Sequence, residues 1–183
     1  MVFLLLSETK KAMVVKDFER WNELVLKRKD IKSSFLNMHL LLLKYPEYRN
    51  LYYHRVKSEY FILGTLLNVF YPKLNSLFLS TPEIGGGLVI FHGFSTIVYC
   101  KKIGENCSIG QQVTVGMTKD YPTIEDNVSI TAGAVVIGGI TIHSNSIIGA
   151  NATVTKSVPP NCVMVGNPAY IVKRNGIRVK EIL

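Results

Sequence analysis

The chain has 183 residues, of which 48% are hydrophobic and 19% charged, and its net charge is +8. This composition excludes a disordered chain and allows either one sizeable core or a small domain joined to a repeat array. Three cysteines without metal-type spacing exclude a disulfide framework and are typical of a reduced, cytoplasmic protein.

Residues 1–79 are predicted to form an N-terminal α-helical domain. The opening MVFLLLSE has no basic region before its apolar run, so we do not expect a signal peptide. Asp17 is placed to cap a first helix, and a second helix is expected over residues 30–43. Pro46 is tolerated in the first turn of a third helix, which Pro72 ends.

The helical domain is basic, because residues 1–79 carry 13 Lys and Arg against 7 Asp and Glu. Such a surface suits an anionic membrane or an acidic acceptor, but an ordinary solvated helix face is the favoured explanation. No aromatic and basic motif points to nucleic acid, and we expect no nucleic-acid partner. The apolar stretch over residues 60–71 is too short to cross a bilayer and predicts a buried helix. Peripheral membrane contact stays open.

Beyond Pro82 the hydrophobic period changes to six. Aliphatic residues recur at this spacing without a break from Ile124 to Val154, and short residues recur four places after them. A six-residue period fits one face of a triangular solenoid whose coils stack through parallel strand pairing. The sequence therefore predicts an all-β left-handed parallel β-helix over residues 80–160. Residues 161–183 are expected to form a C-terminal tail that packs on it.

Two insertions break the six-residue register, one near His92 and a longer one between Val115 and Ile124. Repeat proteins place binding chemistry in such insertions. A hydroxyl that attacks a thioester needs a base to remove its proton, and imidazole is matched to neutral pH. His92 is therefore the candidate general base, with a packing histidine at a subunit surface as the alternative. Backbone N–H groups near Met117 are candidate donors to the oxyanion of the tetrahedral intermediate.

Residues 83–172 resemble the serine acetyltransferase branch of the hexapeptide-repeat acyltransferases. The resemblance is carried by EIGGGLVIFHGFSTIV, IGENCSIGQQVTVG, PTIEDNVSITAGAVVIGG, IGANATVTKSVPPN and VGNPAYIV. Within the family, the layout around FHGFSTIV is most similar to the colanic acid and capsular polysaccharide O-acetyltransferases.

The resemblance implies an acetyl-CoA-dependent O-acetyltransferase with His92 as catalytic base. It also implies acetyl-CoA as donor substrate, no metal, and a cytoplasmic homotrimer with active sites between neighbouring prisms. Pairing of two trimers through the helical half is left open. The residues expected to contact acetyl-CoA are Met117, Ala132, Ala150, Thr155, Lys156 and Lys173.

The chain departs from serine acetyltransferases at charged positions. Phe91 stands where they carry an Asp, Leu77 where they carry an acidic partner for the His, and Tyr121 in a loop where they carry Arg-His. A buried site without these charges should reject a zwitterion. We therefore expect acetyl transfer to a sugar hydroxyl in surface polysaccharide biosynthesis. Serine O-acetylation in cysteine biosynthesis is the alternative.

The side chains expected to contact the carbohydrate or other small hydroxyl acceptor are Phe91, Phe94, Asp120 and Tyr121. What orients His92 is left open between Glu83 and a backbone carbonyl. A metal lyase of the carbonic anhydrase type would need three gathered His ligands, and His92 and His143 do not lie in matching insertions. A scaffold without catalysis is disfavoured by the intact ITAGA, IGANA and VTK segments.

Overall fold

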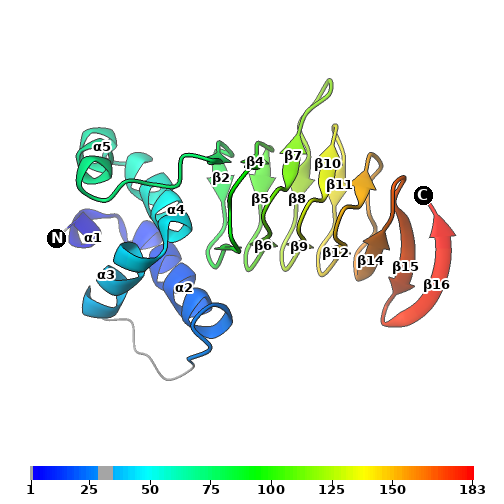
Figure 1. Cartoon of the computed structure of the whole chain (residues 1–183), viewed down its shortest axis with the longest axis horizontal. Coiled ribbons are helices and arrows are strands. Elements are labelled where there is room, and N and C mark those ends of the chain that lie inside the picture. The colour runs from blue at the N-terminus through cyan, green and yellow to red at the C-terminus, as the bar shows by residue number, and fades with distance from the viewer. Residues whose placement is uncertain (1, 29–34) are drawn as a thin grey trace.

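In a computed structural model that describes residues 2–28 and 35–183, the protein is elongated, with helices at one end and a β-solenoid along the remaining length (Figure 1). The N-terminus lies at the helical end and the C-terminus at the far end of the solenoid (Figure 1). The helices are α1 (Val2–Leu5), α2 (Glu8–Leu24), α3 (Phe35–Lys44), α4 (Pro46–Lys57) and α5 (Phe61–Phe70).

The first long helix differs from its prediction. Helix α2 begins at Glu8, and the Ser7 side chain caps it by accepting from the Lys10 N–H. Asp17, predicted as a cap, lies inside this helix and is buried, because it pairs with Arg55 of α4. Residues 30–34 of the predicted second helix lie outside the described residues.

The predicted third helix is divided in two, since α4 ends at Lys57 and α5 begins at Phe61. The expectation that residues 60–71 are buried is wrong. Gly64 is the one fully buried residue of α5. Its large side chains are more than half exposed at Phe61, Ile62, Leu66, Val69 and Phe70. Among the described residues, no helix is long and apolar enough to cross a membrane.

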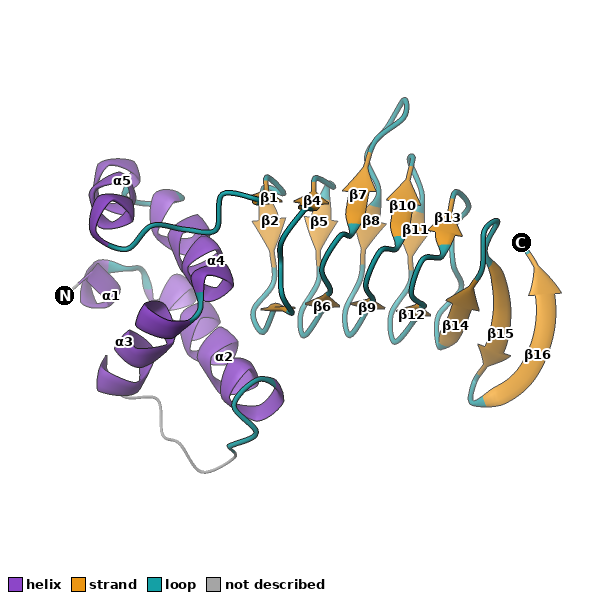
Figure 2. Ribbon diagram, viewed as in Figure 1, coloured by secondary structure: helices purple, strands orange, loops and turns teal. Residues whose placement is uncertain are grey.

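The solenoid has three faces, as the sequence predicts (Figure 2). Face A stacks β1 (Leu77–Leu79), β4 (Thr96–Val98), β7 (Thr114–Gly116), β10 (Val135–Ile137) and β13 (Thr153–Val154). Face B stacks β2 (Glu83–Ile84), β5 (Lys102–Ile103), β8 (Thr123–Ile124) and β11 (Thr141–Ile142). Face C stacks β3 (Val89–Ile90), β6 (Ser108–Ile109), β9 (Ser129–Ile130), β12 (Ile147–Ile148), β14 (Cys162–Val165), β15 (Tyr170–Arg174) and β16 (Ile177–Ile182).

The six-residue period has the predicted physical cause. The aliphatic residues at this spacing, from Ile84 to Val154, are all buried inside the prism. The short residues four places later, such as Cys107 and Ala134, are buried as well. Pairing is parallel and keeps equivalent positions together, as between Ile103 and Ile124.

The ends of the solenoid lie beyond the predicted limits of 80 and 160. Strand β1 pairs with β4 in parallel, three residues before the expected start. Strand β14 pairs in parallel with β12, so the stack continues past residue 160 before β15 and β16 add two antiparallel strands. These end strands leave the six-residue register, so only their pairing reveals them.

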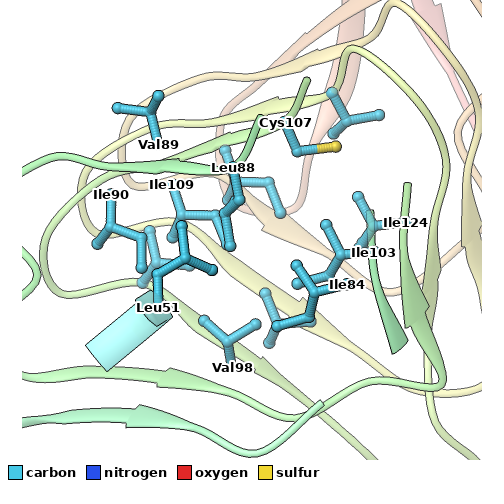
Figure 3. Packing of buried hydrophobic residues seen from close by; sticks show 14 of the residues in the cluster. Leu51, Ile84, Leu88, Val89, Ile90, Val98, Ile103, Cys107, Ile109 and Ile124 are labelled. Carbon is cyan, nitrogen blue, oxygen red and sulfur yellow. The ribbon is translucent and has the colours of Figure 1, made fainter. Parts of the chain in front are cut away.

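Helices α2 and α4 close the N-terminal end of the prism. Leu51 of α4 is fully buried and lies among core residues such as Ile90 and Val98 (Figure 3). The Trp21 indole of α2 donates to the Leu88 carbonyl at 2.9 Å. The helices therefore cover the apolar end of the solenoid next to its first coil.

Candidate active site

His92 lies in the turn over residues 91–95, which joins β3 of face C to β4 of face A. We call the ridge of turns that join these two faces the CA corner. The backbone of His92 is left-handed, with φ of 53°, a region that Asn and His enter more readily than most residues. The imidazole is exposed, and it makes no hydrogen bond or ion pair with any described residue.

Small residues line the CA corner beyond His92. Backbone hydrogen bonds join its successive turns, from Gln112 to Phe94, from Gly133 to Gln111 and from Asn151 to Ala132. A Cβ added to Gly110 would lie 2.8 Å from the Ala132 nitrogen, so the turns stack closely. Ala132 is half-buried and Ala150 is exposed on the same ridge. We call the line of short side chains that runs from His92 past Ala132 to Ala150 the small-residue track of the CA corner.

A second group of candidates lies on the AB corner, the ridge of turns that join face A to face B. Its longest turn, residues 117–122, follows β7 and projects from the solenoid (Figure 2). Met117 is exposed there, and the Tyr121 ring packs on the Tyr99 ring with centroids 4.5 Å apart. Asp120 accepts from Lys101 Nζ at 2.8 Å, a hydrogen bond that lowers the pKa of the Asp120 carboxyl.

The remaining predicted cofactor residues are also spread out. Thr155 and Lys156 follow β13 on the AB corner and are exposed, with the Lys156 ammonium donating to the Leu183 carbonyl. Lys173 is exposed on β15, where it lies opposite Arg178 of the antiparallel strand β16.

Within one chain, the predicted site residues lie in two separate groups, one at the CA corner and one at the AB corner. Strand β4 runs from the CA corner to the AB corner, with the His92 turn before it and Tyr99 after it. From Ser95 to Tyr99 an extended chain covers about 13 Å. Phe91, Phe94, Ala132 and Ala150 share the CA corner with His92, whereas Met117, Asp120, Tyr121, Thr155 and Lys156 lie on the AB corner.

The structure adds a residue that the sequence does not mark. A Cβ added to Gly93 would lie 3.2 Å from Cγ of Glu47, in the first turn of α4. Glu83, considered as a partner for His92, lies instead on β2 of face B, which is opposite the CA corner. Only a tertiary contact reveals Glu47, since 45 positions separate it from His92. Within the described chain, no three His, Cys, Asp or Glu side chains gather as metal ligands.

Comparison with known proteins extends this picture. Residues 121–156 match the bacterial transferase hexapeptide (six repeats) family. The serine acetyltransferase of Staphylococcus aureus is 45% identical over 108 residues, which cover 53% of this chain and 48% of that protein. The serine acetyltransferase of Synechococcus elongatus is 34% identical over 154 residues, which cover 78% of this chain and 63% of that protein. The chain thus spans about half the length of the first of these relatives.

Soybean serine acetyltransferase complexed with serine has a similar structure, with a TM-score of 0.71 and 26% identity. The match covers 91% of this chain and 70% of that one. The β-solenoid is therefore built of hexapeptide repeats, and its fold is similar to that of the soybean enzyme.

These findings correct the predicted acceptor. The sugar hydroxyl, the role in polysaccharide biosynthesis and the special likeness to capsule acetyltransferases are wrong, because these relatives are serine acetyltransferases. The prediction relied on the loss of charge at Phe91 and Leu77, and it took no account of carboxylates from other elements. Glu47 is such a carboxylate, and it reaches the same turn from α4.

Proposed function

We propose that the protein is a serine O-acetyltransferase that uses acetyl-CoA as donor and His92 as general base. The observation that carries the proposal is the exposed His92 imidazole, which no described residue pairs with, at the start of the small-residue track of the CA corner. The likeness to relatives that are serine acetyltransferases supports serine as the acceptor.

The chemistry follows from the base. His92 removes the proton of the serine hydroxyl as its oxygen attacks the thioester carbonyl carbon. The tetrahedral intermediate carries the charge on the former carbonyl oxygen, where backbone N–H groups stabilise it. Its collapse breaks the C–S bond, and the imidazolium returns the proton to the leaving thiolate. The products are O-acetylserine and CoA.

The donor is expected to lie along the CA corner, with the pantetheine arm over Ala132 and Ala150. These side chains are short, so an extended chain can approach the backbone of the stacked turns. Thr155, Lys156 and Lys173 are the candidates for the nucleotide end, since a lysine ammonium suits a phosphate as a point charge.

The active assembly is proposed to be a homotrimer in which the CA corner of one copy faces the AB corner of its neighbour. Such an arrangement brings His92 to Met117, Asp120 and Tyr121, which one chain keeps apart. Face A also carries apolar outward residues, with Phe78 and Ile97 exposed by 57% and 47%. Apolar surface of this kind is typical of contacts between subunits.

Pairing of trimers is proposed to use the distal end of the helical half. The exposed apolar residues of α5 lie there, away from the solenoid (Figure 1).

Steady-state kinetics test the proposal. The purified protein should release thiol from acetyl-CoA when L-serine is present, and His92→Asn should lower kcat by about 10²-fold to 10⁴-fold. Asn accepts the left-handed backbone of this position, so the variant separates loss of the base from damage to the turn. Absence of serine-dependent release, or full activity of His92→Asn, would overturn the proposal.

A further inference from the structure

We propose that Glu47 is the positioning residue for His92, accepting a hydrogen bond from the imidazole N–H that faces away from serine. This inference rests on the proposed function, because it assigns the group that holds the base of that reaction.

The geometry at Gly93 carries the inference. This glycine follows His92 directly, and the three atoms nearest to an added Cβ belong to Ile90, Leu77 and Glu47. The first two side chains are apolar, so Glu47 brings the carboxylate to this turn. The absence of a side chain at Gly93 leaves the space that Glu47 Cγ occupies, 3.2 Å from the added Cβ.

Within the described part of the chain, the Glu47 carboxylate and the His92 imidazole are both without a partner. Neither the Glu47 carboxylate nor the His92 imidazole makes a hydrogen bond or ion pair with any residue that the structure describes. Two other carboxylates of the solenoid are engaged, Asp120 by Lys101 and Glu105 by Lys16, and Glu83 lies on face B, opposite the CA corner. A half-buried carboxylate beside an unpaired imidazole is therefore available to that imidazole.

The chemistry requires such a group. A catalytic imidazole must present one nitrogen to the hydroxyl, and a carboxylate at the other nitrogen fixes the ring orientation and the tautomer. The same carboxylate stabilises the imidazolium that forms during attack. Hydrogen bonds of this kind are often long or absent before the substrate binds, and they tighten in the complex. Helix α4 thereby couples the helical half to catalysis in the first coil.

Glu47→Gln removes the charge and keeps the size of the side chain. We expect kcat for serine acetylation to fall by about 10-fold to 100-fold, with KM values for serine and acetyl-CoA within about twofold of wild type. The acid limb of the pH profile of kcat, which reports the enzyme–substrate complex, should move to lower pH, because the carboxylate no longer stabilises the protonated ring. Glu47→Asp, which keeps the charge on a shorter arm, should retain more activity than Glu47→Gln.

Glu83→Gln is the matched control, since Glu83 is exposed on face B, and it should behave as wild type. The nitrogen-15 chemical shifts of the His92 ring, assigned with His92→Asn, report its tautomer and supply a readout that needs no turnover. Glu47→Gln should change the ratio of the two tautomers, and Glu83→Gln should leave it unchanged. Inactivity of the wild type with serine would reject the proposed function, while the tautomer ratio would still decide the pairing.

Two results would overturn the inference. One is an unchanged tautomer ratio of the His92 ring together with an unchanged kcat in Glu47→Gln. The other is a rise in KM for serine alone, which would assign the carboxylate to the ammonium of serine. Equal melting temperatures of both variants and the wild type show that the fold is intact.

Discussion

The carboxylate of Asp17 and the guanidinium of Arg55 form a fully buried ion pair, 3.0 Å apart, between α2 and α4. Arg55 also donates to the carbonyls of Ile84 and Gly85, and Asp17 accepts from the N–H groups of Gly87 and Leu88. Burial raises the pKa of the Asp17 carboxyl, while Arg55 and the two backbone donors oppose the rise. The pair thus fixes both helices to the coil that leads into β3 and the His92 turn.

Removing one partner of this pair should destabilise the protein strongly. Arg55→Met leaves the Asp17 carboxylate buried without its cation, and we expect the free energy of unfolding to fall by about 3–5 kcal/mol. Urea unfolding followed by circular dichroism measures the change. Arg174→Met is the control, because its ion pair with Glu181 is partly exposed and screened by solvent, so its loss should lower the free energy of unfolding much less. Equal losses in the two variants would contradict the buried role of Asp17–Arg55.

The cysteines should be inert in the folded protein. Burial raises the pKa of the Cys100 and Cys107 thiols to about 11, and Cys162 is also buried. Since thiolate is the reactive form, labelling with a thiol reagent at pH 8 should be at least about 10²-fold slower than in urea. Fast labelling of the native protein would contradict this burial.

The same pKa shift gives a pH dependence. The unfolded chain ionises its thiols near the ordinary pKa of about 8.5, before the folded chain does. Stability should therefore fall as the pH rises from about 8.5 towards 11.

The sequence predicts the features that depend on residues close together in the chain, and it misses those that depend on contacts between distant residues. The solenoid is predictable because each coil repeats a local pattern, from Ile84 to Val154. Asp17 is mistaken for a cap because its burial depends on Arg55, 38 positions later. The candidate site follows the same rule, since its local features are predictable and its tertiary contacts are not. His92 is marked by a break in the repeat, whereas the contact of Glu47 with Gly93 has no local signature.

The shared site can be tested by mixing inactive subunits. His92→Asn damages the CA corner, and Lys156→Glu is expected to damage the AB corner by repelling the CoA phosphates. If each site combines the CA corner of one copy with the AB corner of the next, about a quarter of the sites are intact after refolding an equal mixture. Activity well above that of either variant is expected. If mixed trimers show no recovery of activity, His92 and Lys156 would have to act in a site within one chain.

Assembly through face A makes a separate prediction. Ile97→Glu puts a charge among the exposed apolar residues of this face, so the assembly should dissociate into single chains of 20.5 kDa. Light scattering after size-exclusion chromatography measures the mass. Ile177→Glu, at an exposed position of β16, is the control and should leave the assembly unchanged. A monomeric wild type, or a trimeric Ile97→Glu, would contradict the proposed arrangement.

Pairing through α5 should be separable from trimer formation. Phe61→Ser with Val69→Ser removes two exposed apolar side chains of the distal end and should convert a six-chain assembly into a three-chain one. Analytical ultracentrifugation distinguishes the two. Six chains in the double variant, or three in the wild type, would show that α5 does not pair trimers.

The most direct test of the central claim is identification of the product. The protein is incubated with acetyl-CoA and isotopically labelled L-serine, and O-acetylserine is measured by mass spectrometry over time. We predict that labelled O-acetylserine forms in equal amount to the released CoA with the wild type, and that His92→Asn forms at least about 10²-fold less. Release of CoA without O-acetylserine, or equal yield from His92→Asn, would contradict serine acetylation by a base at the CA corner.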